Sequence, residues 1–193
     1  MSYITNSFDA KVVKLLKLGG VGFMPSDTIY GLSCRALDKK AVARLRKIKG
    51  CDQDKPFIAL ISSLTQLTDV GVITTDVAPA LRYWPGRLTI ICDALIAPLW
   101  LHRGTKTLAV RQPDNEELRN LIAKVGPIIS TSANLASQKP ARSMAAGQKF
   151  FGDKLDFYVD KGTINKKPST IIHATFSKVE VVRPGAVRIK ETT

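Results

Sequence analysis

Helical and extended hydrophobic patterns alternate along the 193-residue chain. Apolar residues spaced three or four apart between positions 8 and 16 predict a first helix, capped by Asn6 or Ser7 and stopped by Gly19-Gly20. A short buried strand is expected next, at 21–24, and a polar turn follows it. The two patterns together favour a fold that contains both helices and a sheet.

A second helix is predicted between Asp38, its N-terminal cap, and Gly50, which ends it. This assignment places Lys49 in the last turn of the helix. A cation suits the helix dipole at that end, and its side chain can reach towards whatever lies beyond the helix.

The other elements follow from the same patterns. Strands are predicted at 57–61, 88–92, 108–111, 128–129, 156–160, 170–174 and 178–183, and helices near 64–69, 76–84, 114–125 and 142–150. Because strands and helices alternate without a strict period, we expect an α/β (α+β) fold, a single domain with a twisted mixed β-sheet flanked by helices. The domain is expected at 8–189, with short termini at 1–7 and 190–193.

Composition places the chain among ordinary folded proteins, with 45% hydrophobic and 23% charged residues. The longest apolar stretch, 88–101, is interrupted by Asp93 and Pro98 and is shorter than the roughly 20 residues that a membrane-spanning helix needs. No signal peptide is recognisable, so we expect a cytoplasmic protein without a membrane partner. The three cysteines form no C-x-x-C pair, which argues against a disulfide framework or a zinc knuckle.

Positive charge is concentrated near the N-terminus. The chain has a formal net charge of +13, and residues 1–50 hold ten basic and three acidic side chains, which supply +7 of it. Such a surplus attracts phosphate-bearing ligands, whether nucleotides or nucleic acids, although a basic surface without a dedicated partner has the same composition.

Familiar catalytic motifs are missing. The sequence has no P-loop pattern and no G-x-S-x-G elbow, and neither histidine has a nucleophile beside it. The glycines at 19–22 follow a predicted helix and precede a strand, which is the reverse of a dinucleotide-binding loop. Without a metal-ligand cluster, we expect no tightly bound metal or organic cofactor, and only Mg²⁺ that accompanies a nucleotide substrate.

Hydroxyl, amide and basic side chains instead gather where predicted strands end or begin. They are Thr28, Arg111, Ser130, Ser132, Asn134, Ser169, Thr170 and Arg183. Ligands of α/β proteins usually bind where loops leave strand ends, so this set suits a polar anionic ligand such as a nucleotide with an amino acid. Taken singly, each residue is equally typical of a turn cap or a solvated surface position.

Seven segments, in this order, resemble the YrdC family of threonylcarbamoyl-AMP synthases. They are 25–32 (PSDTIYGL), 49–50 with 55–56 (KG, KP), 84–89 (WPGRLT), 109–113 (AVRQP), 130–134 (STSAN), 169–172 (STII) and 183–185 (RPG). The ordered set covers the chain from about 8 to 189 and resembles the short, single-domain form. The resemblance implies an open sheet with a basic concave cavity.

The resemblance also implies an activity: formation of L-threonylcarbamoyladenylate and pyrophosphate from L-threonine, bicarbonate and ATP, for the threonylcarbamoyladenosine modification of tRNA. It implies a threonylcarbamoyl transferase machinery downstream. Positions matching the family's threonine site are Thr28, Arg111, Ser130 and Ser169. Positions matching its ATP site are Lys49, Lys55, Thr107, Ser132, Asn134 and Arg183.

One departure from the family pattern keeps an alternative open. Cys51 stands where active members usually carry an arginine that grips phosphate with two hydrogen bonds. Ser26 and Arg87 are milder departures. The alternative function is therefore a YrdC-like paralogue with weak or no synthase activity that binds tRNA or double-stranded RNA. A redox-sensitive role of Cys51 is a third, less ordinary interpretation.

Overall fold

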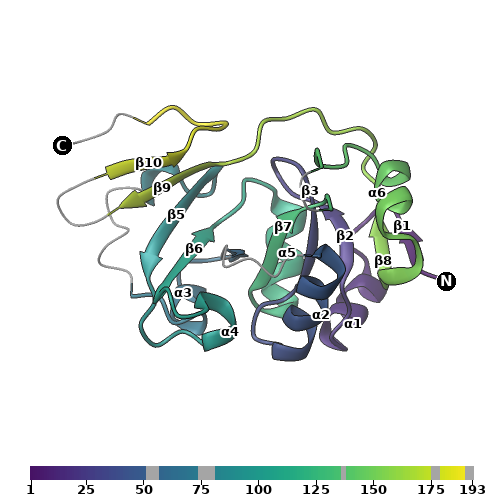
Figure 1. Ribbon diagram of the computed structural model, residues 1–193, viewed down its shortest axis with the longest axis horizontal. Coiled ribbons are helices and arrows are strands. Elements are labelled where there is room, and N and C mark those ends of the chain that lie inside the picture. The colour runs from purple at the N-terminus through teal and green to yellow at the C-terminus, as the bar shows by residue number, and fades with distance from the viewer. Residues whose placement is uncertain (51–56, 74–80, 136–137, 175–178, 190–193) are drawn as a thin grey trace.

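A computed structural model of the chain describes residues 1–50, 57–73, 81–135, 138–174 and 179–189. In these ranges ten strands form one mixed sheet, in the order β1-β8-β2-β3-β7-β4-β6-β5-β9-β10 (Figure 1). The strands are β1 (Tyr3–Thr5), β2 (Gly22–Pro25), β3 (Tyr30–Arg35), β4 (Ile58–Leu60), β5 (Leu88–Asp93), β6 (Thr107–Arg111), β7 (Ile128–Ser132), β8 (Phe157–Val159), β9 (Thr170–Ala174) and β10 (Val179–Arg183).

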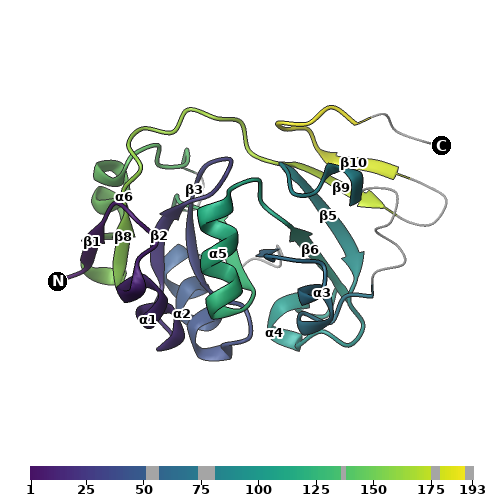
Figure 2. The same ribbon diagram turned by 180° about the vertical axis from the view of Figure 1, so that it is seen from behind.

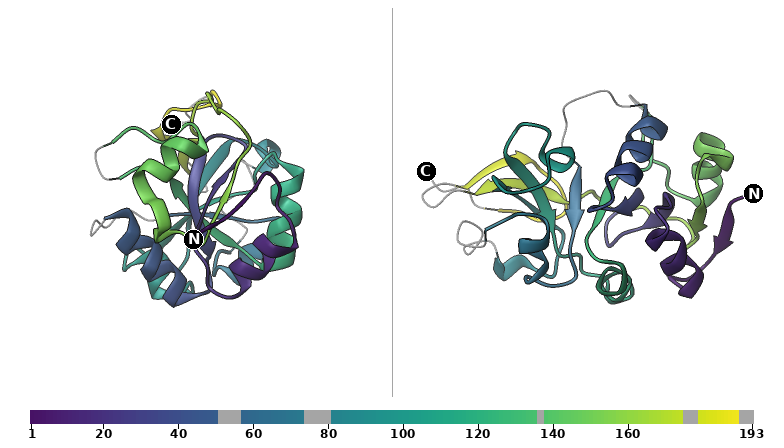
Figure 3. Two further views of the ribbon diagram at one scale, coloured as in Figure 1. Left: turned by 90° about the vertical axis from the view of Figure 1, so that its right-hand side faces the viewer. Right: turned by 90° about the horizontal axis from the view of Figure 1, so that it is seen from below.

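Helices flank this open sheet, as predicted. They are α1 (Ala10–Lys17), α2 (Lys39–Lys49), α3 (Gln66–Asp69), α4 (Leu99–His102), α5 (Glu116–Val125) and α6 (Met144–Phe151), with a 3-10 turn at Gly152–Lys154. The two side views show helices on either side of the strands (Figure 3). Among the described residues, no helix combines the length and apolar character needed to span a bilayer.

Pairing in the sheet explains why it stays open. β3 runs antiparallel to both β2 and β7, while β4 and β6 run parallel, and β5 pairs in parallel with β9. The end strands β1 and β10 each have one neighbour, so the sheet does not close into a barrel. Residues 160–169 cross over the molecule to join β8, near one end of the sheet, to β9, near the other (Figures 1 and 2).

Two hydrophobic clusters lie on the two faces of the sheet. The larger contains Val42 and Leu45 of α2 together with strand residues such as Val110. The smaller packs α1 against α5 and against one end of the opposite face. Side chains alternate along a strand. In β4, β6 and β7, the residues next to those of the larger cluster therefore point to the opposite face of the sheet. Over these strands that second face carries the cavity described below.

Most predicted elements are confirmed, with one wrong cap. Asp9, rather than Asn6 or Ser7, caps α1: its Oδ1 accepts hydrogen bonds from the backbone N–H groups of Lys11 and Val12, both at 2.9 Å. Its Oδ2 accepts from two upstream hydroxyl groups, which fix the carboxylate in the capping position.

Three elements were not predicted from the pattern. β3 contains glycine, serine and cysteine among its six residues, α4 is a single turn, and β1 has only three residues. β1 lies within the segment expected as a short terminus, and it pairs with β8. The helix predicted near 76–84 falls largely outside the described residues.

α2 matters most for the site because it positions Lys49. Asp38 caps it, with its carboxylate accepting from the Ala41 N–H at 3.0 Å, and Gly50 ends it in the left-handed conformation at φ 66°, both as predicted. Leu45 and Val42 anchor the helix in the core.

Replacement of Asp38 by alanine is expected to lower the free energy of unfolding by about 0.5–2 kcal/mol, because the Ala41 N–H loses its acceptor. Urea unfolding followed by circular dichroism measures this change. Lys40→Ala, an exposed substitution in the same turn, is the matched control and should stay within about 0.5 kcal/mol. Equal stability of the two variants would contradict the capping role.

Candidate active site

A cavity of about 810 Å³ lies on the open face of the sheet. Its walls come from segments far apart in the chain: the β2–β3 turn, the end of α2, the central strands and the β9–β10 edge. The described residues that line it are Ser26, Thr28, Ile29, Tyr30, Gly31, Lys49, Phe57, Ile58, Ile91, Ala109, Arg111, Ser130, Thr131, Ser132, Asn134, Pro168, Ser169, Ile171, Val182 and Arg183. This size suits a small ligand or a pair of substrates.

Lys49 enters the cavity from the last turn of α2 and is only 5% exposed. Its Nζ donates to the Ser132 carbonyl, to Ser132 Oγ at 3.2 Å and to Asn134 Oδ1 at 2.7 Å. Ser132 Oγ in turn donates to the same Asn134 oxygen at 2.6 Å. The end of β7 therefore holds a buried ammonium group in one place, which a flexible lysine would not otherwise keep.

Arg111 ends β6 and is also buried. Its Nη2 forms an ion pair with Asp27 Oδ1 at 3.2 Å, and its Nη1 donates to Thr28 Oγ1 at 3.3 Å. Both partners belong to the turn between β2 and β3. The Nε atom is buried without a hydrogen-bond partner among the described residues.

Arg183 ends β10 on the opposite wall. Its Nη2 donates to the Ser169 carbonyl at 2.8 Å and lies 3.2 Å from Ser169 Oγ. The Ser169 hydroxyl also shares a 2.8 Å hydrogen bond with that of Thr89, which is fully buried in β5. As in Arg111, the buried Nε has no hydrogen-bond partner among the described residues.

The charges in this lining favour an anion. Three cations and no carboxylate are found among the described residues that line the cavity. Burial lowers the pKa of the Arg111 guanidinium; the charge of Asp27 opposes this, and that of Arg183 adds to it. Burial likewise lowers the pKa of Arg183. Arginine nevertheless stays protonated. An anion that accepts hydrogen bonds from both guanidinium groups would therefore offset the free-energy cost of burying their charges.

Eight of the ten predicted site residues line this one cavity. They are Thr28, Arg111, Ser130 and Ser169 from the threonine set, and Lys49, Ser132, Asn134 and Arg183 from the ATP set. Lys55 lies outside the described residues, as does Cys51. Thr107 begins β6 on the face that carries Ala109 and Arg111, but it is not among the described lining residues, and its hydroxyl donates to Thr105 Oγ1 at 3.2 Å.

Sequence reasoning missed Asp27 and Thr89, the two side chains that contact Arg111 and Ser169 from behind. Both fall inside segments quoted for the family resemblance, 25–32 and 84–89. The sequence does contain a signal for Asp27, because an acidic residue beside a buried strand needs a cationic partner. That signal does not identify which arginine is the partner.

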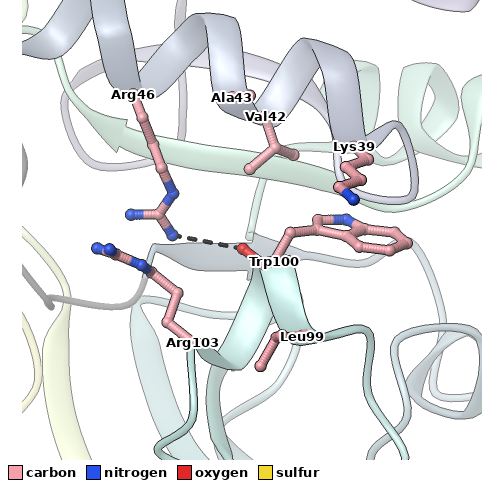
Figure 4. Close-up of a pocket in the computed structure, with 7 residues that line it drawn as sticks. All are labelled: Lys39, Val42, Ala43, Arg46, Leu99, Trp100 and Arg103. Atoms are coloured by element: carbon pink, nitrogen blue, oxygen red, sulfur yellow. Dashed lines mark hydrogen bonds between the residues drawn. The ribbon is translucent and has the colours of Figure 1, made fainter.

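A second, smaller pocket of about 430 Å³ lies between α2 and α4. Figure 4 shows Arg46 and Arg103 side by side near the backbone of Trp100, with Lys39 close to its indole ring. Arg46 donates to the Trp100 carbonyl at 3.5 Å, and its guanidinium lies 4.3 Å from the centre of the Phe57 ring. The first contact joins α2 to α4, and the second joins α2 to the residue before β4. We assign the pocket no chemistry.

Metal ligation by the chain itself has no support among the described residues, where no group of three or more His, Cys, Asp or Glu side chains could hold an ion. Serine and threonine hydroxyls, a lysine and two arginines instead line the cavity. This is an α/β domain with a site suited to a polar anionic ligand on the open face of its sheet. The chain belongs to the Sua5/YciO/YrdC family, whose family model, described as "Telomere recombination", matches residues 14–185.

Two curated relatives illustrate the match. Threonylcarbamoyl-AMP synthase of Pseudoalteromonas translucida is 32% identical over 177 residues, which are 88% of this chain and 95% of that protein. Threonylcarbamoyl-AMP synthase of Pyrococcus abyssi is 32% identical over 182 residues, which are 91% of this chain but 53% of that protein. The chain therefore spans about half of the archaeal relative and nearly all of the bacterial one.

Solved structures agree with the fold. P. abyssi Sua5 complexed with L-threonine matches with a TM-score of 0.85 and 29% identity, over 95% of this chain and 57% of that one. E. coli YciO matches with a TM-score of 0.84 and 26% identity, over 98% of both chains. The predicted family and its open-sheet fold are thus confirmed.

Thr89→Val is expected to lower the free energy of unfolding by about 0.5–1.5 kcal/mol, because the isosteric change removes the buried hydroxyl that pairs with Ser169. Urea denaturation measures it. Thr107→Val is the matched control in the neighbouring strand. Thr107 is only half-buried, so the cost should stay below about 0.5 kcal/mol. If Thr107→Val lowered the free energy of unfolding more than Thr89→Val, the stabilising role assigned to the Thr89 hydroxyl would be contradicted.

Proposed function

We propose that this protein is a threonylcarbamoyl-AMP synthase, which forms L-threonylcarbamoyladenylate and pyrophosphate from L-threonine, bicarbonate and ATP. The observation that carries the proposal is that residues matching the family's threonine site and residues matching its nucleotide site line the same cavity. The reaction needs both substrates side by side, so a shared cavity is its first requirement. The curated relatives described above carry the same name.

On the threonine side, Arg111 is the natural partner of the substrate carboxylate, because guanidinium and carboxylate form charge-assisted hydrogen bonds. Thr28, Ser130 and Ser169 supply hydroxyl groups around it. The substrate amine combines with carbon dioxide, derived from bicarbonate with loss of water, to give a carbamate. A second anionic group thus forms within the cavity.

On the nucleotide side, Lys49 and Arg183 face the phosphates, with Ser132 and Asn134 as polar neighbours. A carbamate oxygen attacks the α-phosphorus of ATP; the new P–O bond forms as the bond to pyrophosphate breaks, and pyrophosphate leaves with that electron pair. The step brings two anions together, so its barrier falls when fixed cations neutralise the charge that develops. No protein nucleophile is required.

ATP enters this proposal as its magnesium complex. No described lining residue is an aspartate or glutamate, so the phosphates, rather than these side chains, would be the magnesium ligands. The chain's own contribution is to bind and orient the two substrates. We propose no other cofactor.

The product would serve a threonylcarbamoyl transferase that modifies tRNA, since an acyl adenylate is an activated donor. The alternative function, a paralogue that only binds RNA, is less favoured. An RNA-binding surface would need the cations but not the buried hydroxyls that match the threonine site. RNA binding through several phosphates would also weaken steeply as salt rises, which separates the two functions experimentally.

Pyrophosphate release from ATP, Mg²⁺ and bicarbonate is expected to depend on L-threonine, with threonylcarbamoyladenylate recovered by chromatography. Lys49→Ala should lower kcat/KM for ATP roughly 10²- to 10³-fold, because a fixed cation at the phosphates is lost. Lys47→Ala, an exposed lysine on the same helix, is the matched control and should change it less than about twofold. Threonine-independent release, or none from the folded wild type, would contradict the proposal.

Cys51→Arg tests the departure from the family pattern. It is expected to raise kcat/KM for ATP at least about tenfold, because an arginine adds a bidentate phosphate contact that a thiol does not offer. Cys51→Ser is the control and should leave the rate near that of the wild type. A silent wild type with an active Cys51→Arg variant would instead identify an attenuated paralogue, and silence in both would favour the RNA-binding alternative.

A further inference from the structure

Asp27 is the one acidic side chain paired with a cation of the cavity among the described residues, yet it does not line the cavity. Its side chain is 1% exposed and that of Arg111 is 4% exposed. Asp27 therefore lies behind the arginine, where it touches no ligand in the cavity.

The two carboxylate oxygens of Asp27 have separate partners. Oδ1 forms the 3.2 Å ion pair with Arg111 Nη2 and makes no hydrogen bond with a described residue. Oδ2 accepts from the Asp114 backbone N–H at 3.1 Å, one residue before Asn115, which caps α5. Asp27 thus ties the β2–β3 turn to the end of β6 and to the start of α5.

The neighbouring Thr28 completes the arrangement, because its hydroxyl accepts from Arg111 Nη1 at 3.3 Å. Two adjacent residues of one turn therefore engage the two Nη atoms of the guanidinium. The group cannot rotate about its stem without breaking one of these contacts. Its Nε–H, buried and without a described partner, keeps a fixed direction.

A buried arginine without an opposite charge is costly, and Arg183 repels it from across the cavity. With Asp27 in place, Arg111 stays charged in the position where it lines the cavity. Without the negative charge of Asp27, the guanidinium would lower its free energy by moving towards water or away from Arg183. Its alignment with an incoming carboxylate would then be lost.

We propose that Asp27 is a positioning residue: through its ion pair it holds the Arg111 guanidinium in the orientation that receives the carboxylate of the amino-acid substrate. The inference rests on the proposed synthase function, and it names the residue on which selection of an α-carboxylate depends. Asp27 acts on the amino-acid side of the cavity and leaves the Lys49 side unaltered.

Asp27→Asn tests this with little change in shape, because the amide oxygen can still accept from the Asp114 N–H. We expect the Kd of L-threonine, measured by titration calorimetry, to rise at least about tenfold and the KM for threonine to rise with it. The Kd of ATP should change less than about threefold. Asp156→Asn is the matched control, because Asp156 also pairs with an arginine, but that arginine, Arg44, is not among the described residues that line the cavity. Both affinities should stay within about twofold in this variant.

A double-mutant cycle separates positioning from a general structural effect. Arg111→Lys alone should weaken threonine binding strongly, and adding Asp27→Asn to it should weaken binding less than about threefold further, because Asp27 acts through the guanidinium. If the two substitutions together raised the Kd of L-threonine by the product of their separate factors, the inference would be overturned. Should Asp27→Asn lack a cooperative unfolding transition, Asp27→Ser, smaller and still a hydrogen-bond acceptor, takes its place with the same expectation.

The outcomes distinguish this inference from the proposed function. Threonine binding and synthesis by the wild type, with unchanged threonine affinity in Asp27→Asn, would overturn the inference alone. Equal losses of threonine and ATP affinity would also overturn it, since they would indicate a general disturbance of the fold. No threonine binding by the folded wild type would overturn the proposed function, and the inference with it.

Discussion

Three cations are placed on one open face of a sheet, and the surrounding structure offsets the cost of withdrawing them from water. Lys49 is held by the end of β7, Arg111 by the β2–β3 turn and Arg183 by the start of β9. Hydroxyl and carbonyl oxygens supply most of these contacts, and among the described residues one carboxylate, that of Asp27, takes part. Since neutral acceptors orient a cation without cancelling it, the positive potential remains available to an anionic ligand.

The sheet topology makes this arrangement possible. Side-chain alternation sends Val110, Ile129 and Ala59 into the larger core and leaves their neighbours on the opposite face. α1 and α5 cover that face only near one end. The uncovered remainder is thus apolar at Ile58, Ala109 and Ile171 and polar at its rim, which is the usual character of a small-molecule site.

The sequence was most informative where local chemistry decides the structure. The Asp38 cap and the Gly50 stop defined α2 to the residue, because both act through the backbone of a single turn. β3 escaped prediction because its glycine and serine weaken the apolar alternation, and its place in the sheet depends on contacts with β2 and β7. The cap of α1 was misplaced by two or three residues, since Asn6, Ser7 and Asp9 have equal local propensity and tertiary contacts of the Asp9 carboxylate favour it. At the site, eight of the described lining residues could be named from their motifs. The pairings behind them could not, because an ion pair between residues 27 and 111 leaves no trace in the local sequence pattern.

The order of strands in the sheet has a consequence for synthesis of the chain. The cavity draws on the turn before β3, on β6 and β7 in the middle of the chain, and on Arg183 at the end of β10. Contacts between such distant positions form late, and a chain that emerges from the ribosome starts with its N-terminal residues. The nascent polypeptide therefore carries Lys49, and later Arg111, without the opposite wall of the cavity until Arg183 has been added. Binding competence arrives only when β10 has joined the sheet.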